Sequence, residues 1–342
     1  MNLKHLTFIR FIVATWVVIF HDWQSLRKYV RTDSPIDVFL GNGNVAVPFF
    51  FTLSGFVLAI NYVDKLNNWK DIEKYIAKRL FRIYPIYFIS VFFTLYFEVL
   101  NHQSSNFFKI FINVILVHSW LINSFDLIIN HPSWSLSIEF FLYLIFPLLI
   151  FFFRKNRAIK INLIILAFIT GIWQILCITG FIYDIPYALS WVFTFSIGII
   201  WGLIYLKKQY NSSLLLTFIG LLLILSVSFG FVNFWNNIAI FCFGVGFFLF
   251  LVSSLQSNLS IFMSLPIFVK LGEISYSIYI IQFPVRMWFR KVLYMYNIHL
   301  SSFKDFMVFY ITLCLLSLLA YEWIEKPIKR KLENVFLRQT YK

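Results

Sequence analysis

Apolar runs long enough to cross a membrane alternate with short polar segments along almost the whole chain. A helix needs about 20 mainly apolar residues to span the hydrocarbon core of a bilayer. The pattern therefore predicts an all-α, polytopic integral membrane bundle of about ten transmembrane helices, with one domain over residues 1–342 and no separate soluble domain. We expect these helices at about 6–23, 45–62, 83–100, 135–153, 161–180, 186–206, 213–231, 238–255, 273–291 and 305–324.

The basic residues predict how these helices are oriented. Lys and Arg cluster at 65–82, 154–160, 207–208 and 326–342, and the loops of membrane proteins that carry such clusters face the cytoplasm. If the apolar segment 107–122 were a spanning helix, the cluster at 154–160 would lie on the opposite side. We therefore expect 107–122 to be re-entrant or interfacial, and both termini to be cytoplasmic.

The composition and the cysteine spacing give no reason to expect a nucleic-acid-binding protein or a metal site. Of the 342 residues, 60% are hydrophobic and 13% are charged, and the net charge is +14. Because the basic residues follow the predicted topology, the positive charge gives no reason to expect nucleic acid as a partner. The three cysteines, Cys177, Cys242 and Cys314, lie in apolar stretches without the spacing of metal ligands, so we expect no metal site.

The first predicted helix carries two ionisable residues, Arg10 and His21. Eleven positions are close to three helical turns, so both side chains project from one face, roughly 16 Å apart along the axis. Ionisable side chains inside a membrane usually mark a functional site. The alternative is that Arg10 reaches the cytoplasmic surface and His21 lies at the opposite interface.

A carboxylate follows near the start of the helix at 135–153, where Glu139 lies about one turn below the predicted outer surface. His21 is expected at a similar depth. A carboxylate beside an imidazole orients the ring and raises its basicity, as a general base requires. The alternative is that Glu139 only stabilises the N-terminus of its helix.

Two arginines, Arg79 and Arg82, precede the helix at 83–100. Residues three apart are neighbours on one helical face, and arginine can hold phosphate oxygens bidentately. With Arg10 about one turn from the same surface, the three could form an anion site that leads into the bilayer. The alternative is the ordinary basic flank of a cytoplasmic loop.

Two further helices carry polar side chains. Ser54 and Gly55 form a small polar notch between aromatic residues, which either contacts a ligand or allows close helix packing. The helix at 273–291 presents a polar stripe of Ser275, Tyr279 and Gln282, and such a stripe must face protein or water.

Six segments, in this order, resemble the motifs of the acyltransferase-3 family of membrane acyltransferases. The opening Arg10-x10-His21 pattern is the first, and the resemblance runs from the first helix to the last. The other segments are Phe49-Phe50-Phe51-Thr52-Leu53-Ser54-Gly55-Phe56, Arg79-x-x-Arg82-Ile83-Tyr84-Pro85, Trp134-Ser135-Leu136-Ser137-Ile138-Glu139-Phe140-Phe141-Leu142-Tyr143, Leu271-Gly272-Glu273-Ile274-Ser275-Tyr276-Ser277-Ile278-Tyr279 and Ile324-Glu325-Lys326-Pro327.

The resemblance implies a ten-helix enzyme of the bacterial inner membrane. It would transfer an acyl group, most often acetyl, from cytoplasmic acyl-CoA to a hydroxyl, commonly on a surface-polysaccharide sugar. His21 matches the family's proposed catalytic histidine, Arg10 matches its partner, and Glu139 matches the acidic position. Arg79 and Arg82 match the arginine pair on the CoA side, so we expect the acyl donor to contact Arg10, Arg79, Arg82, Ser54, Trp134 and Tyr279.

One residue departs from the family pattern, because Gln282 stands where many members have a histidine. A mechanism with a second histidine at that position is therefore not expected. His21 could deprotonate the acceptor or form an acyl-histidine, and Arg10 or Tyr279 could stabilise an oxyanion. The main alternative is a transporter or flippase for a polysaccharide or a lipid-linked sugar. A non-catalytic component of cell-envelope assembly is a third reading.

Overall fold

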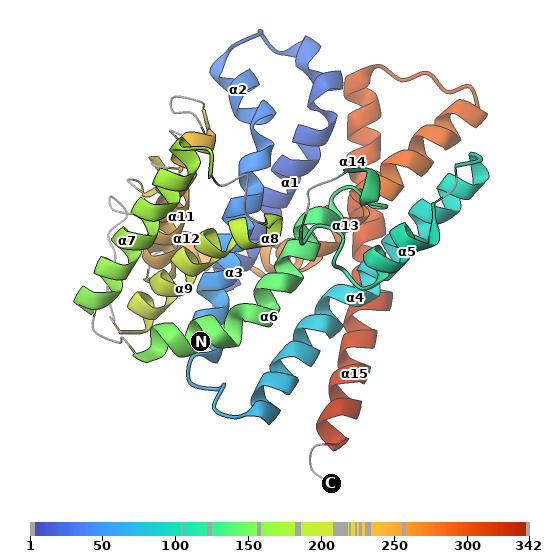
Figure 1. Cartoon of the computed structure of the whole chain (residues 1–342). Helices are drawn as coiled ribbons and strands as arrows, with labels where there is room; N and C mark the ends of the chain where they lie inside the picture. Colours follow the sequence, from blue (N-terminus) through green and yellow to red (C-terminus); the bar gives the residue numbers. More distant parts are fainter. Residues whose placement is uncertain are drawn as a thin grey trace. The chain divides into compact units, whose positions relative to one another are not determined.

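The computed structural model describes residues 4–103, 105–121, 125–155, 159–181, 186–207, 218, 220–222, 224–225, 228–229, 234–254 and 258–339. Across this described part of the chain the structure is helical and contains no strand (Figure 1). Six of its helices are long and apolar enough to cross a membrane. The predicted all-α fold is confirmed for the described residues, and the count of about ten transmembrane helices stays a prediction.

The chain forms two compact units that interleave in sequence. The first unit comprises residues 1–67 and 141–272, and the second comprises 68–140 and 273–342. Two of the three boundaries fall inside continuous helices, α6 (Ser133–Lys155) and α13 (Pro266–Met295), and the third lies between residues 67 and 68. Each unit is described by itself, and the single domain expected from the sequence stays a prediction.

The first unit contains the N-terminal helices and the middle of the chain. Its elements are α1 (Lys4–Leu26), η1 (Arg27–Tyr29), α2 (Pro35–Gly41), η2 (Gly43–Val45), α3 (Ala46–Tyr62), most of α6, α7 (Ile159–Ile178), α8 (Tyr187–Ser190), α9 (Val192–Lys207), α11 (Phe234–Ser254), α12 (Asn258–Met263) and the first residues of α13. Helices α3, α9 and α11 pack against one another at its centre (Figure 1).

Glycines allow α3 and α9 to approach closely. A Cβ atom on Gly198 would lie 2.0 Å from the carbonyl oxygen of Thr52, and one on Gly202 would lie 2.7 Å from that of Phe56. Small residues four apart are typical of closely packed membrane helices, since they let the two backbones touch. This contact holds α3, and with it Ser54, at a fixed place on α9.

The second unit is built on three long helices. Its elements are α4 (Trp69–Leu100), α5 (Phe107–Val114), η3 (Phe125–Leu127), the first two turns of α6, most of α13, α14 (Ser302–Ala320), the π-helical turn η5 (Tyr321–Glu325) and α15 (Lys326–Gln339). Helix α15 packs against α4. The Tyr276 hydroxyl of α13 donates a hydrogen bond to the carbonyl of Ile83 on α4, 2.6 Å away.

The observed helices differ from the predicted ones mainly at their ends. Helix α4 begins at Trp69, well before the predicted start at 83, and a capping box between Asn68 and Asp71 starts it. In residues 107–121, the described part of the segment 107–122, the structure has the eight-residue α5 followed by turns. That helix is about 12 Å long and therefore too short to span a bilayer. The re-entrant or interfacial placement stays a prediction, and the helix expected at 213–231 lies largely outside the described residues.

Candidate functional site

Arg10 and His21 lie on one unbroken helix, α1, as the sequence predicts. At 100° per residue the two positions are about 20° apart around the helix axis and roughly 16 Å apart along it. Arg10 is half-buried and His21 is exposed, whereas the neighbouring Asp22 is buried. The His21 imidazole can therefore be reached by a second molecule, and the buried Asp22 is a charged group that the sequence analysis did not single out.

The segment after α1 folds back onto the helix near His21. Trp16 stacks on Phe39 with ring centroids 4.5 Å apart, and its indole donates to the Phe39 carbonyl at 3.0 Å. The Asp37 carboxylate accepts hydrogen bonds from Trp23 Nε1 at 3.0 Å and from the Arg27 guanidinium at 2.8–3.0 Å. These contacts fix the end of α1 that carries His21.

Asp37 is the charge at the centre of this fold-back. The hydrogen bonds from Arg27 lower the pKa of the Asp37 carboxyl below its ordinary value. The hydrogen bonds from the Asp33 amide and Trp23 lower this pKa further, whereas burial raises it. The carboxylate form is thus stabilised by donors on both sides of the turn. Sequence reasoning missed Asp37 because its partners are 10 and 14 residues away.

The structure explains why position 55, in the notch of Ser54 and Gly55, is a glycine. A Cβ on Gly55 would lie 2.2 Å from the carbonyl oxygen of Phe195 on α9. Close helix packing, one of the two readings of the notch, therefore accounts for Gly55. Ser54 is half-buried on α3, and its expected contact with the acyl donor stays a prediction.

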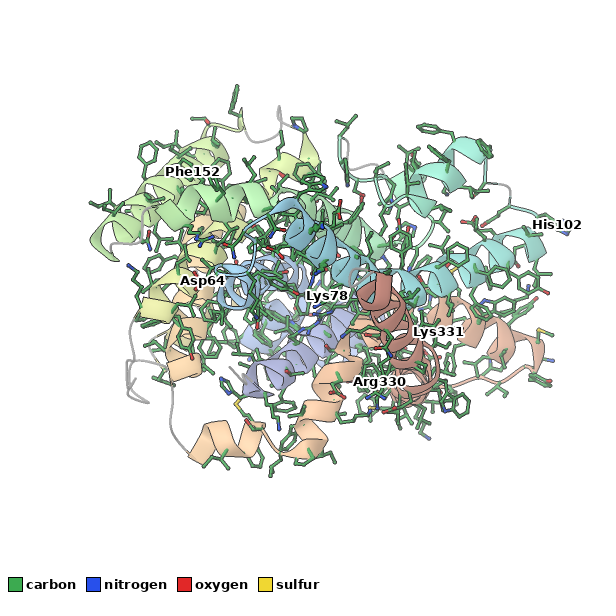
Figure 2. The ribbon with its side chains drawn as sticks, turned by 90° about the horizontal axis from the view of Figure 1, so that it is seen from below. Asp64, Lys78, His102, Phe152, Arg330 and Lys331 are labelled. Atoms are coloured by element: carbon green, nitrogen blue, oxygen red, sulfur yellow. The ribbon has the colours of Figure 1, made fainter. Side chains whose placement is uncertain are left out.

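In the second unit, Arg79 and Arg82 lie in the interior of α4 because this helix starts earlier than predicted. Both side chains are half-buried, and the Arg79 guanidinium lies 6.0 Å from the ring centre of Tyr75. Helix α15, which packs against α4, carries the basic residues Arg330 and Lys331, and Figure 2 labels them together with Lys78 of α4. These two helices thus contribute several basic side chains to the second unit, and Lys326 of α15 is paired with Glu322 at 2.9 Å.

The first turn of α6 is tied to Tyr279 of α13. The Ser135 hydroxyl lies 2.6 Å from the Tyr279 hydroxyl, and both lie within hydrogen-bond distance of the Pro132 carbonyl, at 3.1 and 3.2 Å. Both hydroxyls can donate to the Pro132 carbonyl, and either one can be the donor in the contact between them. The structure thus brings Tyr279 next to the turn that contains Trp134.

The contacts among Ser135, Tyr279 and the Pro132 carbonyl limit the ability of the Tyr279 hydroxyl to donate to a ligand. Its hydroxyl contacts both Pro132 and Ser135, and a hydroxyl has one hydrogen to donate, so donation to an oxyanion competes with donation to these partners. Gln282, the residue that departs from the family pattern, is buried and donates to the carbonyl of Tyr279 at 2.8 Å. Its amide thus contacts the backbone of α13.

The loop between α5 and α6 is held by a buried polar network that the sequence analysis did not predict. His118 Nε2 lies 3.2 Å from the Ser133 carbonyl, and Ser137 Oγ donates to the Leu116 carbonyl at 2.8 Å. Burial lowers the pKa of His118 to about 4, so its imidazole is neutral at pH 7. The network fixes the start of α6, the helix that carries Trp134 and Glu139.

The predicted site residues are divided between the two units. Arg10, His21 and Ser54 belong to the first, and Arg79, Arg82, Trp134, Glu139 and Tyr279 belong to the second. The pairing of His21 with Glu139 therefore stays a prediction. Among the described residues, no group of three or more His, Cys, Asp or Glu side chains is placed to hold a metal ion.

Comparison with known proteins adds independent information. The model of the acyltransferase domain family matches residues 3–322. One similar protein is "Acyltransferase MdmB" of Streptomyces mycarofaciens, 35% identical over 127 residues, which are 35% of this chain and 31% of that protein. Another is "Putative acetyltransferase ORF330" of Acidianus two-tailed virus, 28% identical over 155 residues, which are 45% of this chain and 42% of that protein. The chain thus spans less than half the length of either relative, and no solved structure matches it.

Proposed function

The chain belongs to the acyltransferase-3 family, and we propose that it is a membrane O-acyltransferase that transfers an acyl group, preferably acetyl, from acyl-CoA to a hydroxyl of a cell-surface polysaccharide or related glycan. The observation that carries this proposal is the pair Arg10 and His21 on one face of a membrane-length helix in a chain of this family. An imidazole at this position has the chemistry to activate a hydroxyl.

We propose that the protein lies in a bacterial inner membrane with both chain termini in the cytoplasm. The acyl donor would then bind from the cytoplasmic side. CoA carries phosphate groups, and Arg79 and Arg82, three residues apart on α4, lie on one face of that helix. Arginine suits this role because its planar donors can hold a phosphate bidentately. Arg10, Ser54, Trp134 and Tyr279 are proposed to contact the rest of the donor.

The reaction follows from the chemistry of a thioester. His21 takes the proton of the acceptor hydroxyl, and the hydroxyl oxygen forms a bond to the thioester carbonyl carbon. The carbon–sulfur bond then breaks, and the leaving thiolate takes the proton from the imidazolium to give free CoA and an acyl ester. The Glu139 carboxylate is proposed to raise the basicity of His21. An acyl-histidine intermediate would give the same products in two steps.

The test is acyl transfer by the purified protein in bilayers, with acetyl-CoA labelled in the acetyl group and a surface-glycan extract as acceptor. We expect free CoA to appear and the label to pass to the glycan. A transporter or flippase for a polysaccharide or a lipid-linked sugar would move the glycan across the bilayer without consuming acetyl-CoA. Glycan movement without release of CoA would therefore contradict the proposal.

A further inference from the structure

Helix α13 contains a proline, Pro284, within its continuous helical span. A proline has no backbone N–H, so the carbonyl of the residue four positions earlier loses its donor in the helix. In α13 that carbonyl belongs to Ile280. A carbonyl inside a membrane protein must find another donor, because the surrounding hydrocarbon offers none.

The side chain of Asn130 supplies that donor. Its Nδ2 lies 2.8 Å from the Ile280 carbonyl oxygen and 2.9 Å from the Ser90 hydroxyl on α4. An amide NH₂ group has two hydrogens, and these two contacts use both. Asn130 is fully buried, so water does not compete for these bonds.

The same loop also holds the neighbouring residue of α13. The carbonyl of Pro132, two positions after Asn130, accepts from the Tyr279 hydroxyl at 3.2 Å, and the Asn130 carbonyl accepts from the Ser133 amide at 2.8 Å. Asn130 therefore ties α4, the start of α6 and the proline turn of α13 together. Tyr279 precedes Ile280, so its place depends on that turn.

We propose that Asn130 is a positioning residue whose side-chain amide takes the place of the backbone N–H that Pro284 lacks, and so fixes Tyr279 beside the first turn of α6. The effect on acyl transfer rests on the proposed function, whereas the structural link between Asn130 and Pro284 does not. The two parts can therefore be tested separately.

The structural part is tested by a double-mutant cycle in thermal stability with Asn130→Ala, Pro284→Ala and the double variant. An alanine at 284 has an N–H that can reach the Ile280 carbonyl. Asn130→Ala should therefore lower the Tm clearly in the wild-type background and much less in the Pro284→Ala background. Equal lowering in both backgrounds would overturn the proposal. If Asn130→Ala does not fold, recovery of folding in the double variant supports the link, and failure of the double variant also overturns it.

A matched control is Asn101→Ala. The Asn101 side chain donates to the Phe97 carbonyl at 2.7 Å in an exposed position at the end of α4. The same substitution there removes this bond and the exposed contact of Lys291 Nζ with Asn101 Oδ1 at 3.4 Å. Water can replace both, so the Tm should change little. A lowering as large as that of Asn130→Ala would show that the effect is not specific to the proline turn.

The functional part is tested by the kinetics of acyl transfer. A displaced Tyr279 should lower the kcat of Asn130→Ala about tenfold or more, because small errors in positioning slow a reaction strongly. The KM for acyl-CoA should change much less, and Pro284→Ala should restore part of the kcat. An unchanged kcat together with the stability coupling would overturn the role in catalysis. Absence of transfer by the wild-type protein would instead contradict the proposed function and leave the stability cycle valid.

Discussion

The close contact between α3 and α9 predicts that Gly55→Ala destabilises the protein. A Cβ at position 55 would lie 2.2 Å from the Phe195 carbonyl oxygen and 3.1 Å from the Ile199 nitrogen, whereas ordinary contact begins at 3.4 Å. The obstacle is the backbone of α9, which cannot rotate away as a side chain could. The two helices must therefore separate by about 1.2 Å at this point.

The expected magnitude combines two opposing effects. Overpacking of this kind costs about 1–3 kcal/mol, and replacing glycine by alanine inside a helix returns about 0.5–1 kcal/mol. We therefore expect a net loss of about 1–2 kcal/mol in the free energy of unfolding, which corresponds to a Tm lowered by about 2–6 °C. Gly171→Ala is the matched control, since a Cβ on Gly171 of α7 would meet nothing within 4 Å, and it should raise the Tm slightly.

A thiol-reactive dye can follow this unfolding in detergent. Cys242 is fully buried on α11, the helix that packs against α3 and α9, so it becomes reactive when the first unit opens. Replacing Cys177 and Cys314 with serine leaves Cys242 as the reporter. A Tm for Gly55→Ala equal to or above that of Gly171→Ala would refute the reasoning.

Three further predictions concern the polar clusters. Asp37→Asn should lower the Tm at pH 7 and flatten its acid dependence, because the lowered pKa of Asp37 stabilises the fold above about pH 4 and this stabilisation is lost as the pH falls through that pKa. His118 is neutral in the fold and has a pKa near 4 against 6.5 for the free side chain. The protein should thus lose up to ~3 kcal/mol between pH 6.5 and 4, and His118→Gln should reduce that slope in thermal melts. Ser135→Ala and Tyr279→Phe should each slow acyl transfer. The double variant should be little slower than the slower single variant, because both substitutions remove the same hydrogen bond between the two hydroxyls. Fully additive rate losses would contradict this expectation.

The sequence predicts the helical regions well where they are apolar and less well where they are charged. The start of α4 is missed because residues 69–81 are polar and basic, although the capping box at Asn68 and Asp71 is a local signal for it. Helix α13 extends from Pro266 to Met295, beyond the predicted bounds of 273–291, and its ends are missed because they carry charged residues such as Lys270 and Lys291.

The site is predictable where it depends on one helix and not where it depends on distant contacts. Arg10 and His21 share a face because their spacing fixes it. The bond from Asn130 to Ile280 joins residues 150 positions apart, and no local pattern predicts the partner. A signal does exist, since Pro284 predicts that the Ile280 carbonyl needs an external donor.

The most direct test of the proposed function is the rate of acyl transfer from acetyl-CoA by wild-type protein, His21→Ala and His299→Ala at equal abundance in bilayers. His299 is an exposed histidine in the loop before α14, and its replacement should leave the rate unchanged. We predict that His21→Ala abolishes both release of CoA and labelling of the glycan. Transfer at the wild-type rate by His21→Ala would contradict the proposed mechanism.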